Sequence, residues 1–366
     1  MVTREESTIC IELETPINDD RPVFLAGGFC DWYPDTASFQ MKRQTETSYI
    51  YHFPKKWLKE EKLEYKYTKG GWEHVELDLL GNPSANRKIE AKQQTVTDFV
   101  PNWRSHGQTP FLKKFLPISE LLAEDFYIPQ LNKTRKIHVL LPYNYYENPT
   151  KRYPVLYMQD AQNLFGEGSS YGNWEIDKRL SLLAASGKGE VIVVAIEHGN
   201  EDRFTEYSPY KSTLKGKGQG TKYANFIVRT LKPFVDMAYR TRPERAFTGV
   251  GGSSMGGLVS IYSGLMYPET IGRLLVFSPS LWVSSKIYFD AMEFFHPQET
   301  KMYLYAGGKE SDYMLPNLQK LRETIENQGF DAKKLDIHTS IDLAGEHQEK
   351  RWGQEFPKAI SYLFGS

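Results

Sequence analysis

The sequence predicts two domains of different class, an all-β sandwich followed by an α/β domain with a mostly parallel sheet. Its length of 366 residues is enough for two domains. Short strand-like runs separated by turn residues fill the first hundred residues. From about residue 126 onward, strand-like runs alternate with helix-like periods, a pattern typical of a sheet with helices on both faces.

The N-terminal domain is expected to cover residues 1–105. Clusters of Asn, Asp, Gly and Pro separate its apolar or alternating runs, which predict short strands. These strands are expected at residues 7–13, 22–29, 48–53 and 63–68. Short strands at this spacing favour an antiparallel, immunoglobulin-like sandwich. Residues 106–125 lack a strand pattern, so we expect a linker with a short helix there.

The C-terminal domain is expected to cover residues 126–366. Apolar, β-branched runs predict seven strands, at residues 135–142, 153–160, 190–198, 245–252, 273–280, 301–308 and 334–341. Apolar residues at helical spacing predict helices at residues 223–239, 255–267 and 315–328. Strands that alternate with helices in this way form parallel sheets.

The composition excludes several classes of function. Lys and Arg total 45 against 46 Asp and Glu, and the resulting net charge of −1 gives no global attraction to nucleic acid or an acidic membrane. No apolar run approaches the roughly 20 residues that span a bilayer. The N-terminus lacks a basic segment followed by an apolar one, which favours a cytoplasmic protein, although a mature secreted or periplasmic chain would read the same.

Cofactor and metal signatures are missing from the sequence. Two cysteines, Cys10 and Cys30, are too few for a disulfide framework or a four-ligand zinc site. No His, Cys and Asp cluster has metal-ligand spacing, and no Gly-rich loop stands in a dinucleotide-binding context. We therefore expect chemistry carried by side chains alone, with no cofactor and no metal.

A nucleophile motif lies at Gly252-Ser253-Ser254-Met255-Gly256, which fits G-x-S-x-G. It follows a predicted strand and opens a predicted helix, the context in which such a turn lifts its serine above the sheet. Glycines on both sides allow the strand and the helix to approach closely. Ser254 is the expected nucleophile, and the backbone N–H of Met255 at the helix start is expected to face a developing oxyanion.

A serine nucleophile needs a base and an acid, which in hydrolases of this architecture follow it in the order acid, then histidine. His296, His338 and His347 follow Ser254. His347 lies in a Gly-containing loop between the last strand and the final helix, where a base must enter, whereas His338 reads as a strand residue. Two carboxylates follow the strand at 301–308, and Glu310 is favoured over Asp312 as the acid that orients the imidazole.

Further residues are expected around the nucleophile. A second oxyanion donor should follow the strand at 153–160, near Asp160 and Ala161. Four side chains are candidates for binding the substrate, although each could equally be a core or surface residue. They are Trp282 as a pocket wall, Arg203 as an anchor for an anionic or phenolic group, and Tyr207 and Tyr223 at the pocket mouth.

Residues 126–366 resemble the Putative esterase family, which includes enterochelin esterases, esterase D-like enzymes and feruloyl esterase domains. The resemblance is carried by the segment around the nucleophile motif, residues 223–282, and by YPVLYMQDAQNLF and AGEHQEKRW. It implies an α/β-hydrolase fold in which Ser254 and His347 match the nucleophile and the base. Glu310 matches less securely, because the family varies there.

The N-terminal half resembles a starch-binding carbohydrate-binding module. VFLAGGFCDW, LEYKYTKGGW, NPSANR and TVTDFVPNWR occur in that family's order. The resemblance implies that Trp32 and Trp72 match tryptophans that stack on glucose rings. This sequence departs from that family by carrying residues 73–81 between Trp72 and NPSANR. The insertion is expected to displace Trp72, the second stacking position. A sandwich that only shapes the esterase cleft is the alternative.

These observations predict a serine carboxylic-ester hydrolase that forms an acyl-enzyme. Its substrate is expected to be a catecholate siderophore ester or a feruloyl or acetyl ester of a carbohydrate. The alternative is a protein that binds a starch- or glycogen-like polysaccharide and whose hydrolase domain is weak or inactive. The expected partners are small-molecule or carbohydrate esters, with polysaccharide as a further ligand and with no nucleic acid or membrane.

Overall fold

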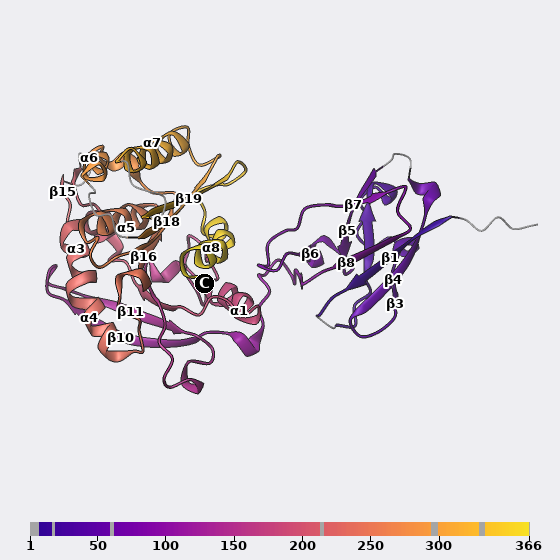
Figure 1. Cartoon of the computed structure of the whole chain (residues 1–366), viewed down its shortest axis with the longest axis horizontal. Coiled ribbons are helices and arrows are strands. Elements are labelled where there is room, and N and C mark those ends of the chain that lie inside the picture. The colour runs from indigo at the N-terminus through magenta and orange to yellow at the C-terminus, as the bar shows by residue number, and fades with distance from the viewer. Residues whose placement is uncertain are drawn as a thin grey trace, which may run out of the picture. The chain divides into compact units, whose positions relative to one another are not determined.

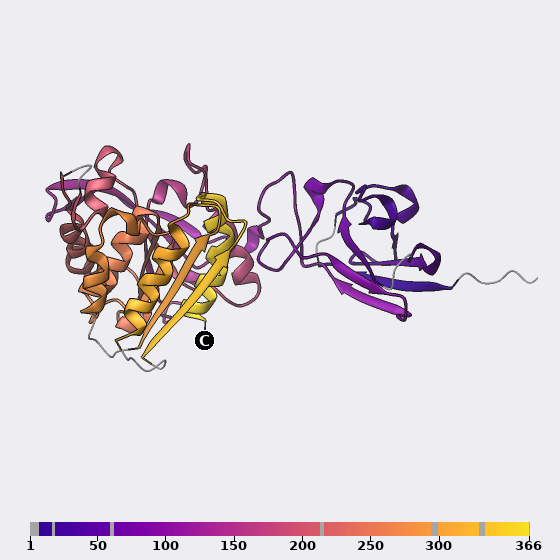
Figure 2. The ribbon, with the colours of Figure 1, turned by 90° about the horizontal axis from the view of Figure 1, so that it is seen from above.

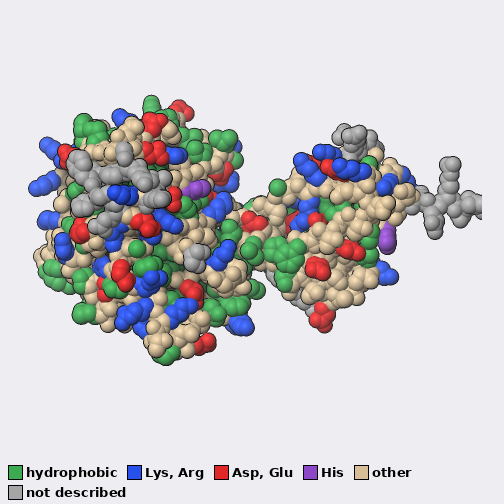
Figure 3. All heavy atoms as spheres, in the orientation of Figure 1, with side chains coloured by type: hydrophobic (Ala, Val, Ile, Leu, Met, Phe, Trp, Pro, Cys, Tyr) green, Lys and Arg blue, Asp and Glu red, His purple; other side chains and the backbone are tan. Residues whose placement is uncertain are grey.

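The chain folds into two compact units, Met1–Phe111 and Leu112–Ser366. The computed structural model describes residues 7–16, 19–58, 62–212, 216–293, 299–328 and 334–365. Figure 1 shows strands in the first unit and alternating strands and helices in the second. On the face of each unit seen in Figure 3, positive and negative side chains are intermingled.

The described part of the first unit is built of short strands and 3₁₀ turns. Its strands are β1 (Thr8–Glu14), β2 (Phe24–Gly27), β3 (Lys42–Arg43), β4 (Ser48–Pro54), β5 (Lys62–Thr68), β6 (Glu76–Leu77), β7 (Arg87–Glu90), β8 (Thr95–Phe99) and β9 (Asn102–Trp103). The four strands expected from the sequence are confirmed as β1, β2, β4 and β5.

These strands form two main sheets, with orders β3-β4-β1-β8 and β2-β5-β7. Residues from both sheets, such as Ile11, Phe53, Leu25 and Tyr67, belong to one buried hydrophobic cluster. The pairing differs from the expected antiparallel pattern at one place, because β1 and β8 run parallel. Large aromatic side chains, among them Phe53, Tyr67 and Trp103, belong to this small core.

The second unit is built around an eight-stranded sheet of order β10-β11-β13-β12-β16-β17-β18-β19. Its strands are β10 (Ile118–Ile128), β11 (Lys133–Leu141), β12 (Val155–Gln159), β13 (Ile192–Ile196), β16 (Thr248–Ser253), β17 (Arg273–Phe277), β18 (Thr300–Gly307) and β19 (Leu335–Asp342). Neighbouring strands in the series β13-β12-β16-β17-β18-β19 are parallel, and β10 and β11 add an antiparallel edge. All seven strands predicted for this domain are confirmed. A small hairpin, β14 (Lys211–Ser212) with β15 (Gly216–Lys217), lies apart from this sheet.

Helices cover the sheet of the second unit. They are α1 (Ile176–Ala185), α2 (Arg203–Tyr207), α3 (Gly220–Phe226), α4 (Lys232–Ala238), α5 (Met255–Met266), α6 (Lys286–Met292), α7 (Met314–Glu326) and α8 (Glu349–Phe364). A π-helical turn, Ile227–Leu231, joins α3 to α4. The three predicted helices are confirmed as α3 to α4, α5 and α7. Figure 2 shows α7 along the long strands β18 and β19. No described helix combines the length and apolarity needed to cross a bilayer.

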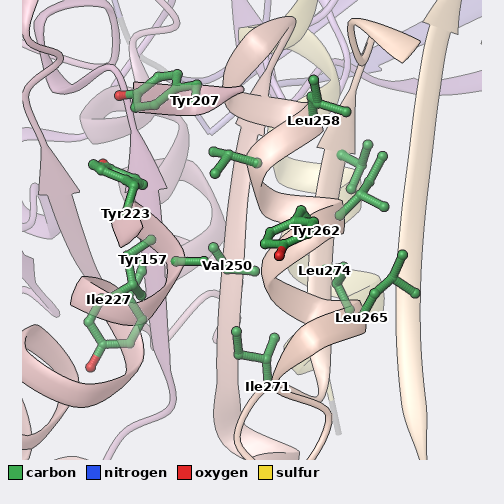
Figure 4. Close-up of a cluster of buried hydrophobic side chains, with 14 of the residues drawn as sticks. Tyr157, Tyr207, Tyr223, Ile227, Val250, Leu258, Tyr262, Leu265, Ile271 and Leu274 are labelled. Atoms are coloured by element: carbon green, nitrogen blue, oxygen red, sulfur yellow. The ribbon is translucent and has the colours of Figure 1, made fainter. Parts of the chain in front are cut away.

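The core of the second unit explains why its strands are almost wholly apolar. Helix α5 is buried along nearly its whole length and packs on β16 and β17. Figure 4 shows Leu265 of α5 beside Leu274 of β17, and Leu258, Val250 and Tyr223 belong to the same cluster. A sheet covered on both faces needs apolar side chains on both sides of each strand. This packing holds the carboxyl ends of the parallel strands at one edge.

The segment expected to be a linker with a short helix differs in the structure. It contains a 3₁₀ turn at Lys113–Phe115, and from Ile118 it forms most of β10. Register shifts near Ala123 interrupt the pairing of β10 with β11. These irregularities break the two-residue alternation of side chains that identifies a strand in a sequence.

Candidate active site

The sharp turn between β16 and α5 places Ser254 at the carboxyl edge of the sheet. Ser254 has φ 55° and ψ −120°, a conformation that is strained for a residue with a side chain. Its N–H donates to the carbonyl of Phe277, and its carbonyl accepts from Leu258. These bonds hold the backbone in the strained turn, and the geometry is that of the strand–turn–helix motif predicted from the sequence.

Two glycines make this turn possible because of how closely other atoms approach them. A Cβ at Gly252 would lie 3.0 Å from the backbone carbon of Gly256 and 3.1 Å from the side chain of Gln159. A Cβ at Gly256 would lie 3.0 Å from the Asp160 carboxylate. The same contacts show that the loop after β12 lies directly beside the first turn of α5.

Ser254 opens into a pocket of about 710 Å³ at this edge. The Ser254 hydroxyl lies 3.2 Å from that of Ser280, whose N–H donates to the Ser254 carbonyl. The described residues that line the pocket are mostly polar. They are Asn163, Tyr171, His198, Asn200, Glu201, Arg203, Ser253, Ser254, His347, Gln348, Glu349 and Trp352.

His347 lines the same pocket and is bound to a carboxylate. Its Nδ1 lies 2.7 Å from Oε2 of Glu310, whose side chain is 1% exposed. The second oxygen, Oε1, accepts hydrogen bonds from the Ser278 hydroxyl and the Gly307 N–H, both at 2.6 Å. Asp312, the other candidate for the acid, is exposed. The structure thus pairs His347 with Glu310.

The other histidines after Ser254 are placed differently. His338 lies on β19 as expected, with its ring against those of Tyr303 and Tyr362. His296 falls outside the described residues.

The predicted oxyanion donors lie at two adjoining backbone segments. Met255 begins α5, and the first N–H groups of a helix have no partner inside the helix. Asp160 follows β12 in a left-handed conformation with φ 61°, and Ala161 begins a 3₁₀ turn. The contact between Gly256 and Asp160 brings the two segments together beside Ser254.

Arg203 lines the pocket, but its charge is already paired. Its guanidinium binds the Asp160 carboxylate through two hydrogen bonds, Nε to Oδ1 at 2.6 Å and Nη2 to Oδ2 at 2.8 Å. A bidentate pair of this kind is strong and holds both partners in fixed orientation. Arg203 therefore braces the loop after β12, which carries one of the predicted oxyanion donors.

The prediction that Tyr207 and Tyr223 line the pocket mouth is wrong for this structure, because both are fully buried. Their rings pack 5.0 Å apart, the Arg203 guanidinium lies over Tyr207, and the Tyr223 hydroxyl donates to Gln159. Trp282 is 60% exposed and packs beside Phe204, outside the pocket lining given above.

Sequence reasoning did not assign several polar residues of the pocket and of the support behind it. Ser278 connects Glu310 to Trp352, whose indole N–H donates to the Ser278 hydroxyl at 2.9 Å. Glu349, two residues after His347, binds the amide of Asn163. Burial raises the pKa of the Glu349 carboxyl and lowers that of the His198 imidazole. The repeated serines of SPSLW after β17 were the available signal for Ser278 and Ser280.

In the first unit, the structure brings the two predicted sugar-stacking tryptophans together. The rings of Trp32 and Trp72 are 6.3 Å apart and inclined at 37°. Trp72 is 38% exposed, and Trp32 is half-buried. Asp31 and Trp32 both have positive φ values, 51° and 60°, which is uncommon for residues with side chains. The inserted residues 73–81 form a turn and β6 without separating the two rings.

The fold and the site together define the class of this protein. A mostly parallel sheet, a serine on a strained strand–helix turn and a histidine after the last strand are the features of an α/β-hydrolase-like fold. Residues 128–363 match the family described as Putative esterase, which is more than half of the chain. The chain belongs to the Putative esterase family, whose class is ester hydrolases.

Curated proteins and solved structures are similar to this chain. The uncharacterized protein YbbA of Bacillus subtilis (strain 168) is 24% identical over 249 residues, which cover 63% of this chain and 93% of YbbA. The enterobactin esterase FES of Shigella flexneri, solved in the presence of enterobactin, has a TM-score of 0.54 at 14% identity and covers 99% of this chain and 94% of FES. A ferulic acid esterase of Anaeromyces mucronatus, solved with ferulic acid, has a TM-score of 0.51 at 20% identity, over 68% of this chain and 92% of that one. At these identities the solved structures establish a shared fold.

Proposed function

We propose that this protein is a serine carboxylic-ester hydrolase that acts through an acyl-enzyme. One observation carries the proposal: Ser254, on a strained turn, shares a polar pocket with His347, and Nδ1 of that imidazole is bound to buried Glu310. A nucleophile, a base and a group that orients the base are thereby assembled around one cavity.

The mechanism follows from these positions. An ionised Glu310 can only accept hydrogen bonds, so Nδ1 of His347 carries a proton and Nε2 is free to take one. Nε2 removes the Ser254 proton as Oγ attacks the ester carbonyl, and the N–H groups of Met255 and Ala161 stabilise the oxyanion. The imidazolium then protonates the departing alcohol. Water repeats the sequence, releasing the acid and restoring Ser254.

The substrate class is argued from the charges in the pocket. Two carboxylates, Glu201 and Glu349, line it, while the cation of Arg203 is paired with Asp160. This arrangement disfavours a highly anionic ligand such as an iron-loaded catecholate siderophore. Amide, imidazole and carboxyl groups are instead suited to binding hydroxyls. A feruloyl or acetyl ester of a carbohydrate therefore fits better than the catecholate ester, which remains the second candidate.

Hydrolysis assays test the proposed function. Wild type should hydrolyse p-nitrophenyl acetate and one of two larger esters, methyl ferulate or a catecholate trilactone. Ser254→Ala and His347→Gln should each lose roughly 10⁴–10⁶-fold in kcat. Ser263→Ala is a matched control, because its buried hydroxyl bonds the Val259 carbonyl within α5. Wild-type turnover in Ser254→Ala would exclude this mechanism, and an inactive wild type would favour a binding protein instead.

A second function is proposed for the first unit, which we infer to be a carbohydrate-binding sandwich. The adjacent rings of Trp32 and Trp72 favour it, because aromatic faces stack on the C–H surfaces of sugars. Two consecutive left-handed residues hold Trp32 beside its partner, and strained backbone of this kind concentrates at functional sites.

Affinity electrophoresis of the full chain in gels containing soluble starch tests this second function. Starch should retard wild type, and Trp32→Ala and Trp72→Ala should migrate as if starch were absent. Trp57→Ala is the matched control, because Trp57 is 40% exposed in the same unit and packs on Phe39 instead. If wild type migrates equally with and without starch, the sandwich is a scaffold and not a starch-binding module.

A further inference from the structure

Ser278 has an unusual backbone for a buried residue. It follows β17 with φ 46°, in the left-handed region, and it is fully buried. Its N–H donates to the carbonyl of Tyr305 on the neighbouring strand β18. A left-handed conformation is unfavourable for a residue with a side chain, so it persists where other contacts enforce it. The hydroxyl of Ser278 supplies a reason for this strain.

The direction of the hydrogen bonds at this hydroxyl is fixed by elementary chemistry. The indole N–H of Trp352 can only donate, so the Ser278 oxygen accepts from it at 2.9 Å. A hydroxyl has one proton, and that proton points to Oε1 of Glu310 at 2.6 Å. Oε1 also accepts from the Gly307 N–H. With Oε1 occupied twice, Oε2 faces His347.

Trp352 reaches the other end of the same chain of contacts. Its ring packs edge-to-face on the His347 imidazole, with centroids 4.8 Å apart and planes at 86°. The contacts therefore close a circuit that runs from Trp352 to Ser278, to Glu310, to His347 and back to Trp352. Its members come from the end of β17, the loop after β18, the loop before α8 and α8 itself.

We propose that Ser278 and Trp352 are positioning residues for the catalytic base. Together they hold the Glu310 carboxylate in one rotation and keep the imidazole in the tautomer that accepts a proton at Nε2. The proposal rests on the proposed esterase function and adds to it two residues that act through Glu310 and His347. It predicts that their loss weakens proton transfer and leaves ester binding intact.

The test uses full-length Ser278→Ala, Trp352→Phe and the double variant. Ser278→Ala should lose about 10- to 100-fold in kcat on an alkyl ester, the worth of a hydrogen bond to a charged group, with KM nearly unchanged. Trp352→Phe should lose about 2- to 10-fold, because its indole N–H bonds the neutral Ser278 hydroxyl. The loss in kcat should be smaller on a p-nitrophenyl ester. p-Nitrophenolate can depart without being protonated, whereas an alkoxide must be protonated by the imidazolium as it leaves. The kcat of the double variant should fall no further than that of the worse single variant, since both substitutions interrupt the same series of hydrogen bonds.

Matched controls separate positioning from general damage. Ser263→Ala removes a buried serine hydroxyl within α5, and Trp103→Phe removes a buried indole N–H bonded to Thr15 in the first unit. Both should keep wild-type kcat on both esters. Thermal unfolding of every variant identifies any that fails to fold. If Ser278→Ala does not fold, Trp352→Phe decides the test, because it removes the indole N–H and keeps an aromatic ring.

A proton NMR measurement keeps the test independent of turnover. The Nδ1–H of His347 should give a downfield signal that is absent in His347→Gln and shifted or lost in Ser278→Ala. Unchanged signal and kcat in both single variants, equal losses on the two esters, or independent losses in the double variant would overturn the proposal. Activity that depends on Ser254 would survive such a result, so the esterase function and the positioning role are judged separately.

Discussion

At the scale of single residues, the site depends on hydrogen bonds that fix the orientation of a few groups. One carboxylate oxygen of Glu310 accepts hydrogen bonds from Ser278 and Gly307, and the other binds His347. The Arg203 guanidinium donates two hydrogen bonds to the Asp160 carboxylate. Both groups are held in place by protein partners, whereas Ser254, His347 and the pocket carboxylates line the cavity where a substrate would bind.

The choice between the two candidate acids is tested by a pair of amide substitutions. In Glu310→Gln, the two donors at Oε1 select the amide oxygen, so the amide nitrogen faces His347. Nδ1 must then accept, and the proton moves to Nε2, where it blocks the base. We expect kcat to fall roughly 10³- to 10⁴-fold. Exposed Asp312→Asn should keep wild-type kcat, and a comparable loss there would contradict the assignment of Glu310.

At the scale of elements, α8 brings Trp352 and Glu349 to the site because it packs unusually close to its neighbours. A Cβ at Gly353 would overlap the carbonyl oxygen of Trp174. The ring of Trp174 stacks on Phe277 at the end of β17 and also contacts Trp352. The glycine therefore sets the distance between α8 and the loop in front of it, and through Trp352 it sets the position of His347.

Gly353→Ala tests this packing. The added methyl group should destabilise the protein by about 1–3 kcal/mol, the usual range for overpacking, and lower kcat by moving Trp352. Denaturant unfolding and ester hydrolysis measure the two effects. Gly28→Ala is the control, since its new methyl group would meet only Leu63 at 4.0 Å. Wild-type stability in Gly353→Ala would show that α8 does not need this close approach.

The elements also show what the sequence can and cannot predict. Periodicity located the strands of the second unit because a doubly covered sheet leaves long apolar runs. It missed β10, whose bulges disturb the alternation near Ala123. Motif and chain order located Ser254 and His347, which depend on local context. The pairing of Arg203 with Asp160 joins segments about 40 residues apart, and Tyr207 is buried against Tyr223 of another helix, so no local pattern records either.

At the scale of the whole molecule, every described residue that lines the catalytic pocket lies between Asn163 and Trp352. Residues 112–366 should therefore fold alone and hydrolyse p-nitrophenyl acetate with a kcat/KM within about threefold of the full chain, since the second unit has its own core. Circular dichroism and initial rates of the two proteins compare them. A folded but inactive fragment would show that the first unit contributes to catalysis.

The order of strands in the large sheet has a consequence for biosynthesis. Apart from the exchange of β12 and β13, the strands stand side by side in the order in which a ribosome releases them. The sheet can grow by adding each new strand to the exposed edge of the last. Glu310 and His347 follow β18 and β19, the final two additions. A nascent chain therefore gains its first unit long before its catalytic base, and at synthesis rates of roughly 5–20 residues per second it stays without hydrolytic activity for many seconds after Phe111 is made.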